Sequence, residues 1–169
     1  MKKALFLALW LLAASAVYSD DVVKREGEPD VVNIADDDAS MEAAVDRAQA
    51  TVDRFIEKLP ELQQRGVYVS IKVPINEGDD VEFIWVADLK FADGVFQGVL
   101  ANQPVYGSLN VGDPVSTPVE DVYDWFALID NELHGGFTIY VTRDKMGEED
   151  RKNFEQTVGF RMPAEPKEL

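Results

Sequence analysis

The chain has 169 residues, a hydrophobic share of 46% and a formal net charge of −16, which is typical of one globular domain and argues against wholesale disorder. The negative charge argues against nucleic acids and anionic membrane surfaces as partners, since Lys and Arg bind both, whereas a basic protein partner is compatible with it. The absence of cysteine excludes disulfides, thiolate metal sites and cysteine nucleophiles.

Residues 1–16 have the pattern of a secretory signal peptide. Two lysines precede the apolar run 4–14, and Ala14-Ser15-Ala16 fits the small-x-small cleavage pattern. The run is shorter than the ~20 apolar residues of an ordinary transmembrane helix, so an uncleaved anchor is the less favoured alternative. We therefore predict an exported bacterial protein, periplasmic or secreted, with no stable membrane insertion after cleavage.

Residues 17–38 are acidic and have no sustained hydrophobic period, which predicts a flexible leader. The aspartates at its end lack the spacing of a calcium-binding loop. One of them is therefore expected to cap the helix that follows, by accepting hydrogen bonds from its free N–H groups.

The stretch 40–59 is the clearest helix of the chain, and Pro60 is expected to end it. Its apolar residues recur at alternating steps of four and three: Met41, Val45, Ala48, Val52, Phe55 and Leu59. Packing of this stripe on the protein's own sheet is favoured over docking of a partner.

Two stretches of alternating residues follow, and both predict strands. In 67–75 the apolar residues point one way, while Tyr68, Ser70, Lys72 and Pro74 point the other. Because proline cannot donate a hydrogen bond, Pro74 is expected at an edge or a strand end. The stretch 81–104 is typical of a hairpin that turns at Asp93-Gly94. One face of this hairpin is expected in the core, namely Val81, Phe83, Trp85, Ala87, Leu89, Phe91, Phe96, Gly98 and Leu100.

The remaining segments predict the last strands of the antiparallel sheet, a helix and a tail. They are a peripheral strand at 115–119, a hairpin of strands 122–129 and 136–142 turning at Asp130-Asn131, a helix at 147–158 capped by Gly159, and a loose tail at 163–169. We therefore predict a single α+β domain at 39–162. An N-terminal amphipathic helix would pack on a strongly bent antiparallel sheet of about five to six short strands, with a short C-terminal helix.

A recurring combination of motifs covers most of this domain, roughly 36–161. Its residues are Met41, Ala44, Phe83-Ile84-Trp85-Val86, Asp88, Gly94, Phe96, Gly98, Leu100, Asn102, Pro104, Gly112-Asp113, Val115, Asp124-Trp125, Gly135-Gly136 and Thr138. The combination resembles a bacterial domain family of unknown function that includes exported YegJ-like proteins. The resemblance implies one compact domain and export, and it implies no catalytic residues.

Few residues offer chemistry, and we predict no catalytic residue, metal ion or cofactor. His134 is the only histidine, and no strained G-x-S-x-G turn accompanies it, so a Ser-His-Asp triad is not expected. Gly135-Gly136 is expected to precede a strand, whereas phosphate-binding loops open a helix. Carboxylates such as Asp88, Asp113 and Asp124 could form a hydrolytic pair, although capping and ion pairing explain them more simply.

The remaining candidate is a binding surface. The connection 102–113 is the longest irregular piece of the domain, and such loops often carry function. Tryptophan is enriched in binding hot spots, although core packing is its default role. We therefore expect an exported binding or interaction module with a basic protein partner. Its candidate binding residues are Asn102, Pro104, Asp113, Asp124 and Trp125. The alternatives are a carboxylate-based hydrolase and a structural envelope-associated accessory protein.

Overall fold

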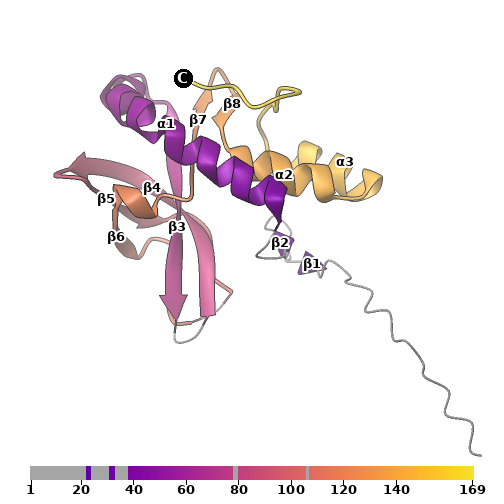
Figure 1. Ribbon diagram of the computed structural model, residues 1–169, viewed down its shortest axis with the longest axis horizontal. Coiled ribbons are helices and arrows are strands. Elements are labelled where there is room, and N and C mark those ends of the chain that lie inside the picture. The colour runs from indigo at the N-terminus through magenta and orange to yellow at the C-terminus, as the bar shows by residue number, and fades with distance from the viewer. Residues whose placement is uncertain (1–21, 24–30, 33–37, 78–79, 106) are drawn as a thin grey trace, which may run out of the picture.

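The structure is a computed structural model that describes residues 22–23, 31–32, 38–77, 80–105 and 107–169 (Figure 1). The predicted signal peptide and most of the predicted leader lie outside these ranges. Its elements in chain order are β1 Val22–Val23, β2 Val31–Val32, α1 Ala39–Gln64, β3 Tyr68–Glu77, β4 Asp80–Ala92, β5 Val95–Leu100, β6 Pro114–Pro118, the 3-10 helix η1 Val119–Asp121, β7 Asp124–Ile129, β8 Glu132–Gly135, α2 Phe137–Lys145 and α3 Glu148–Thr157.

An open antiparallel sheet with α1 on one face forms the body of the protein. Strands β1 and β2 pair only with each other, and the other six are ordered β6-β5-β4-β3-β7-β8. Figure 1 shows α1 crossing the sheet on one side, with α2 and α3 beside its N-terminal end. The predicted α+β class is confirmed.

Helix α1 begins where the sequence predicts and ends later. The Asp38 carboxylate accepts hydrogen bonds from the N–H groups of Ser40 and Met41, at 3.0 and 3.1 Å. The expectation that Pro60 ends the helix is wrong, because α1 continues to Gln64. Proline costs one helical hydrogen bond, but the next turn buries Leu62 on the sheet, and this burial favours continuation.

The main core lies between α1 and the inner face of the sheet. The helix contributes Ala48, Val52, Phe55 and Leu59 to it, as its stripe predicts. The central strands contribute buried side chains of alternating residues, which are Val69, Ile71 and Val73 on β3 and Ile84 and Val86 on β4. Pro74 lies beyond the last residue of β3 that pairs with β7, so its missing N–H breaks no bond to that strand.

The first part of β4, up to Val86, turns the opposite face to the core from the one that we expected. Val81 and Phe83 are 54% and 38% exposed, and Trp85 is only partly buried. The register shifts between Ala87 and Lys90, where Asp88 has a φ of 52°. This β-bulge exchanges the two faces, so Leu89 beyond it is buried as predicted. The turn at 93–94 is confirmed, with positive φ at both residues.

The predicted strand at 136–142 is a helix. Strand β7 turns at 130–131 as expected, but β8 ends at Gly135, and α2 begins at Phe137. The alternation of apolar residues there is typical of a strand. In the structure Phe137 and Tyr140, three residues apart, are both buried, which is the spacing of a helix face. The predicted C-terminal helix and its left-handed Gly159 are present.

The tail is not loose, because it runs beside β8 and is hydrogen-bonded to it. The N–H of Leu133 donates to the carbonyl of Arg161 at 2.9 Å, and that of Gly135 donates to the carbonyl of Lys167 at 2.7 Å. Leu169 packs against the core. The expectation is corrected for a physical reason: β8 is an edge strand, and the tail satisfies its outward-facing N–H groups.

No helix in the described ranges is long and apolar enough to span a membrane.

Candidate functional site

The predicted site residue Asp124 is fully buried and caps helix α2 from the neighbouring strand. One carboxylate oxygen accepts from the N–H of Trp125 at 2.8 Å and of Phe137 at 3.3 Å. The other accepts the N–H and the hydroxyl of Thr138, at 2.8 and 2.7 Å. The helix has no side-chain cap of its own at Gly136. Asp124 therefore supplies the cap that the start of α2 lacks.

This cap occupies the N–H groups that follow the glycine pair, and the expectation that the pair precedes a strand is wrong. Gly135-Gly136 opens a helix, not a strand, so its position is that of a phosphate-binding turn. The N–H groups of Phe137 and Thr138 are already bonded to Asp124. A side chain at Gly135 would also meet the carbonyl of Trp125, with its Cβ only 2.3 Å away. The turn is thus filled by the protein itself.

The environment of Asp124 raises the pKa of its carboxyl, and both of its oxygens already accept hydrogen bonds, so neither is free to react with a substrate. Burial raises the pKa of Asp124 to about 6, while the hydrogen bonds from Thr138 and the charge of Lys72 act in the opposite direction. A catalytic carboxyl must reach the reacting atoms. Both oxygens of Asp124 are engaged in the cap, and the residue has no exposed surface. The structure therefore gives Asp124 a structural role.

Trp125, another predicted binding residue, lies in the main core. Its ring stacks on Phe55 with centroids 5.1 Å apart. Its indole N–H points to α1, 3.2 Å from the carbonyl of Ala48 and 3.0 Å from the hydroxyl of Thr51. The side chain has no exposed surface. Trp125 thus fastens α1 to the sheet, and it offers nothing to a partner in this conformation.

The other three predicted residues hold the connection between β5 and β6. The side-chain oxygen of Asn102 accepts from the N–H of Trp85 at 2.9 Å, which continues the pairing of β4 beyond β5. Pro104 is buried. A carboxylate oxygen of Asp113 accepts from the N–H of Asn110 at 2.8 Å, inside the turn that precedes β6. Their contacts position the loop on the sheet, and they do not converge with Asp124 or Trp125.

The outer face of the sheet carries an aromatic surface that the sequence did not single out. We call it the open face; it consists of Tyr68, Lys72, Phe83, Trp85 and Tyr123. Its rings form two groups of contacts, one of them through the buried ring of Phe126, and Lys72 lies between the two groups. Phe83 lies 3.9 Å from Tyr123 between centroids, and Phe126 lies 4.7 Å from Trp85 and 5.8 Å from Tyr68. Tyr68 is 48% exposed and Phe83 38%.

Among the residues that the structure describes, other elements cover one end of this outer face. A small second core surrounds Phe126 and Leu133 on β7 and β8, and its cover comes from Tyr140 on α2 and from Phe160 and Met162. Strands β3 and β4 carry the open face farther along the sheet. Large aromatic side chains with exposed surface on one sheet face are the usual composition of a contact surface.

Lys72 lies at the centre of the open face. Its Nζ is 5.7 Å from the ring centroid of Trp85 and 5.8 Å from that of Tyr123. Trp85 and Asp124 are its cross-strand neighbours on β4 and β7. Burial lowers the pKa of the Lys72 ammonium, and the charge of Asp124 opposes this shift. The cation is therefore balanced by rings on one side and by a carboxylate on the other.

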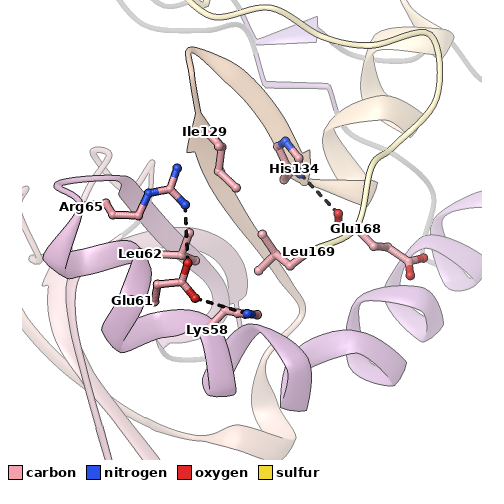
Figure 2. Close-up of a pocket in the computed structure, with 8 residues that line it drawn as sticks. All are labelled: Lys58, Glu61, Leu62, Arg65, Ile129, His134, Glu168 and Leu169. Carbon is pink, nitrogen blue, oxygen red and sulfur yellow. Dashed lines mark hydrogen bonds and ion pairs between the residues drawn. The ribbon is translucent and has the colours of Figure 1, made fainter.

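A shallow cleft of about 210 Å³ lies elsewhere, between the last turns of α1, the β7–β8 hairpin and the tail (Figure 2). Leu62, Ile129 and Leu169 line it with apolar surface. At its rim, Glu61 lies 3.3 Å from Lys58 and 3.7 Å from Arg65. His134 also lines the cleft, and its Nδ1 lies 3.3 Å from the carbonyl oxygen of Glu168. Lys58, Glu61 and Arg65 at this rim are paired with one another, and Glu168 pairs with Arg47, so the cleft is a weaker candidate than the open face.

The open face was hidden in the sequence because both faces of β4 are apolar. Phe83 and Trp85 alternate with Ile84 and Val86, so the pattern alone does not say which pair is inside. Strand β3 carried a usable signal, since Tyr68 and Lys72 lie on the face opposite its aliphatic residues.

Within the described ranges, no group of three or more His, Asp or Glu side chains is arranged to hold a metal ion.

Comparison with known proteins places the chain among bacterial relatives. The chain is 27% identical over 140 residues to "Uncharacterized protein YegJ" of Escherichia coli (strain K12), covering 82% of this chain and 86% of that protein. It is 29% identical over 144 residues to "Putative ankyrin repeat protein NMB1133/NMB1171" of Neisseria meningitidis serogroup B, covering 79% of this chain and 56% of that protein. No solved structure matches it significantly. Residues 38–162 match a family model, and the chain therefore belongs to the family described as "Uncharacterized protein conserved in bacteria (DUF2314)".

Proposed function

We propose that the protein is an exported interaction module that binds a basic segment of a partner protein on its open face. The observation that carries the proposal is the exposure of Tyr68 and Phe83 on the side of the sheet opposite α1. Phe83 contacts Tyr123, and Tyr68 is linked to Trp85 through the buried ring of Phe126. Because Lys72 lies between Trp85 and Tyr123, a partner would meet one surface, not scattered side chains.

Charge supports the basic character of the partner. The net charge is −16, so a basic protein is attracted over a long range. The cation on the open face does not oppose this, because Lys72 lies beside the carboxylate of Asp124. Aromatic ring faces also attract Lys and Arg side chains. Both the field of the whole chain and the local chemistry favour a cationic ligand.

The carboxylate-based hydrolase is less well supported, because the carboxylate of Asp124 already accepts the hydrogen bonds that cap α2. The structural, envelope-associated alternative makes the same surface a fixed contact instead of a reversible one. Export itself rests on the charged and apolar pattern of 1–16. Mass spectrometry of the protein from its native host should find a mature N-terminus near Val17, and a full-length chain in the inner membrane would contradict export.

Site-specific cross-linking tests the open face directly. A photoreactive phenylalanine analogue at Tyr68 or Phe83 should trap a basic protein in the native host. The same analogue at Gln156 on α3, which is exposed, serves as the control and should trap none. A variant with the analogue at Val111, 53% exposed in the 102–113 connection, tests the loop as the contact surface. Cross-links from Val111 alone would overturn the open face and restore the loop.

The association rate with the trapped partner gives a second readout. Electrostatic steering weakens as salt rises, because the Debye length falls from ~10 Å at 0.1 M to ~3 Å at 1 M. The on-rate should therefore fall steeply across this range. A rate that ignores salt would show that the negative charge plays no part in recognition.

A further inference from the structure

The most unusual feature of the open face is the position of its own cation. Lys72 places Nζ within 6 Å of the ring centroids of both Trp85 and Tyr123, at 5.7 and 5.8 Å. Phe83 backs Tyr123, with centroids 3.9 Å apart. Two rings, one from β4 and one from the residue before β7, thus lie around one ammonium group, and a third ring packs behind Tyr123.

A carboxylate completes this arrangement. Lys72 has two cross-strand neighbours, Asp124 on β7 and Trp85 on β4. Rings that bind a cation through their faces, with an anion close by, are the composition of sites that recognise alkylammonium groups. Asp124 cannot turn away from this role, because α2 holds both of its oxygens.

We propose that Trp85 and Tyr123, with Phe83 packed behind Tyr123 and Asp124 on the neighbouring strand, form a cage for an alkylammonium ion, and that Lys72 occupies this cage as an internal ligand. The cage would accept a lysine side chain of the basic partner when Lys72 moves out. The choice of a lysine side chain as the outside ligand rests on the proposed function. The cage itself can be tested without a partner.

Exchange of the occupant is physically feasible. Within the described residues, no hydrogen bond fastens Nζ of Lys72, so ring faces and charge hold it. A second ammonium group can make the same cation–π contacts with the two rings and so replace the first. Lys72 as a residue is only partly buried on the face of β3, whereas its ammonium group is desolvated, so exchange requires this group to move outward.

Two substitutions of Lys72 distinguish an open cage from a filled one. Lys72→Ala empties it, whereas Lys72→Met fills it with an apolar chain of similar length. Tetramethylammonium is the probe, and its methyl proton resonance moves upfield when it lies over ring faces. We expect a saturable upfield shift with Lys72→Ala, and binding at least about tenfold weaker with Lys72→Met and with the unaltered protein. Absence of a saturable shift with a folded Lys72→Ala, or equal binding by all three proteins, would overturn the cage.

A measurement on the unaltered protein keeps the proposal testable if Lys72→Ala does not fold. The ε-methylene protons of Lys72 should resonate upfield of those of Lys90, an exposed lysine of β4 that serves as the internal reference. Equal shifts for the two lysines would refute the internal ligand. The outcomes also separate the two proposals: a cage that binds the probe while Tyr68 and Phe83 trap no partner would leave the cage and remove the proposed function.

Discussion

Asp124 on β7 holds the start of α2 through Thr138, with one carboxylate oxygen accepting both the N–H and the hydroxyl of that residue at 2.8 and 2.7 Å. The contact joins the sheet to a helix whose first residue lies only two positions beyond β8. It explains why an Asp-Trp pair and a Gly-Gly-x-Thr motif occur together in this sequence. Each motif supplies one side of the same buried junction.

Removal of this cap should destabilise the protein. Asp124→Ala would leave buried N–H groups at the start of α2 without acceptors, which costs roughly 1–3 kcal/mol for each group left unpaired. Asp113→Ala is the matched control, because Asp113 is only partly buried and lies in a loop. Urea unfolding should show a loss of several kcal/mol for the first variant and less than about 1 kcal/mol for the second. Equal losses would contradict the buried cap.

The pH dependence of stability should report the same carboxyl. Burial raises the pKa of Asp124 from 3.8 to about 6, so the folded chain keeps a proton that the unfolded chain releases in this interval. The associated stabilisation is complete below about pH 4 and is lost as the pH rises through 6. Relative to Asp124→Asn, the protein should therefore lose up to about 3 kcal/mol of unfolding free energy between pH 4 and pH 7.

The comparison with Asp124→Asn is needed because other carboxyls titrate in the opposite sense. Lys145 holds the pKa of Asp38 well below its usual range, and Lys167 lowers the pKa of Glu132. Their stabilisation is lost as the pH falls, and it is common to both proteins, so it cancels in the difference. A difference in unfolding free energy that is constant from pH 4 to pH 7 would refute the raised pKa of Asp124.

The two tryptophans of the sheet should differ in their effect on stability. Trp125→Ala would open a cavity beneath α1 and should cost roughly 3–5 kcal/mol, as large aromatic truncations in cores do. Trp85 is partly exposed on the open face, so Trp85→Ala should cost about half of that or less. Thermal or urea unfolding of both variants checks the order. A larger loss for Trp85→Ala would show that Trp85 is the more deeply buried of the two, and it would contradict the assignment of the faces of β4 given above.

The close approach at Gly135 should make it intolerant of a side chain. Gly135→Ala combines a left-handed φ of +70° with a Cβ 2.3 Å from the carbonyl oxygen of Trp125. Gly112→Ala is the control, since its φ is +90° but nothing lies within 4 Å of its Cβ. The control should lose about 1–2 kcal/mol from the backbone alone, and Gly135→Ala about 1–3 kcal/mol more from overpacking. Similar losses would show that the contact can relax.

Several features of the fold follow from local sequence alone. The turns at Asp93-Gly94 and Asp130-Asn131 need residues that accept a positive φ, and such residues stand there in the sequence. The stripe of α1 is visible because helical spacing puts Ala48, Val52 and Phe55 on one side. These features depend on neighbours in the chain, which is why the sequence by itself determined them, together with the α+β class.

The tertiary structure decided which surfaces are buried and which residues form the candidate site. The bulge at Asp88 exchanges the faces of β4, so Trp85 lies on the open face and not in the core. Asp124 caps a helix 13 residues away in sequence, and the tail pairs with β8 across an even longer separation. Such contacts join residues through space, and no periodicity of the chain records them. The cluster around Lys72 depends on the register of β3 with β4 and β7, which only the folded sheet defines.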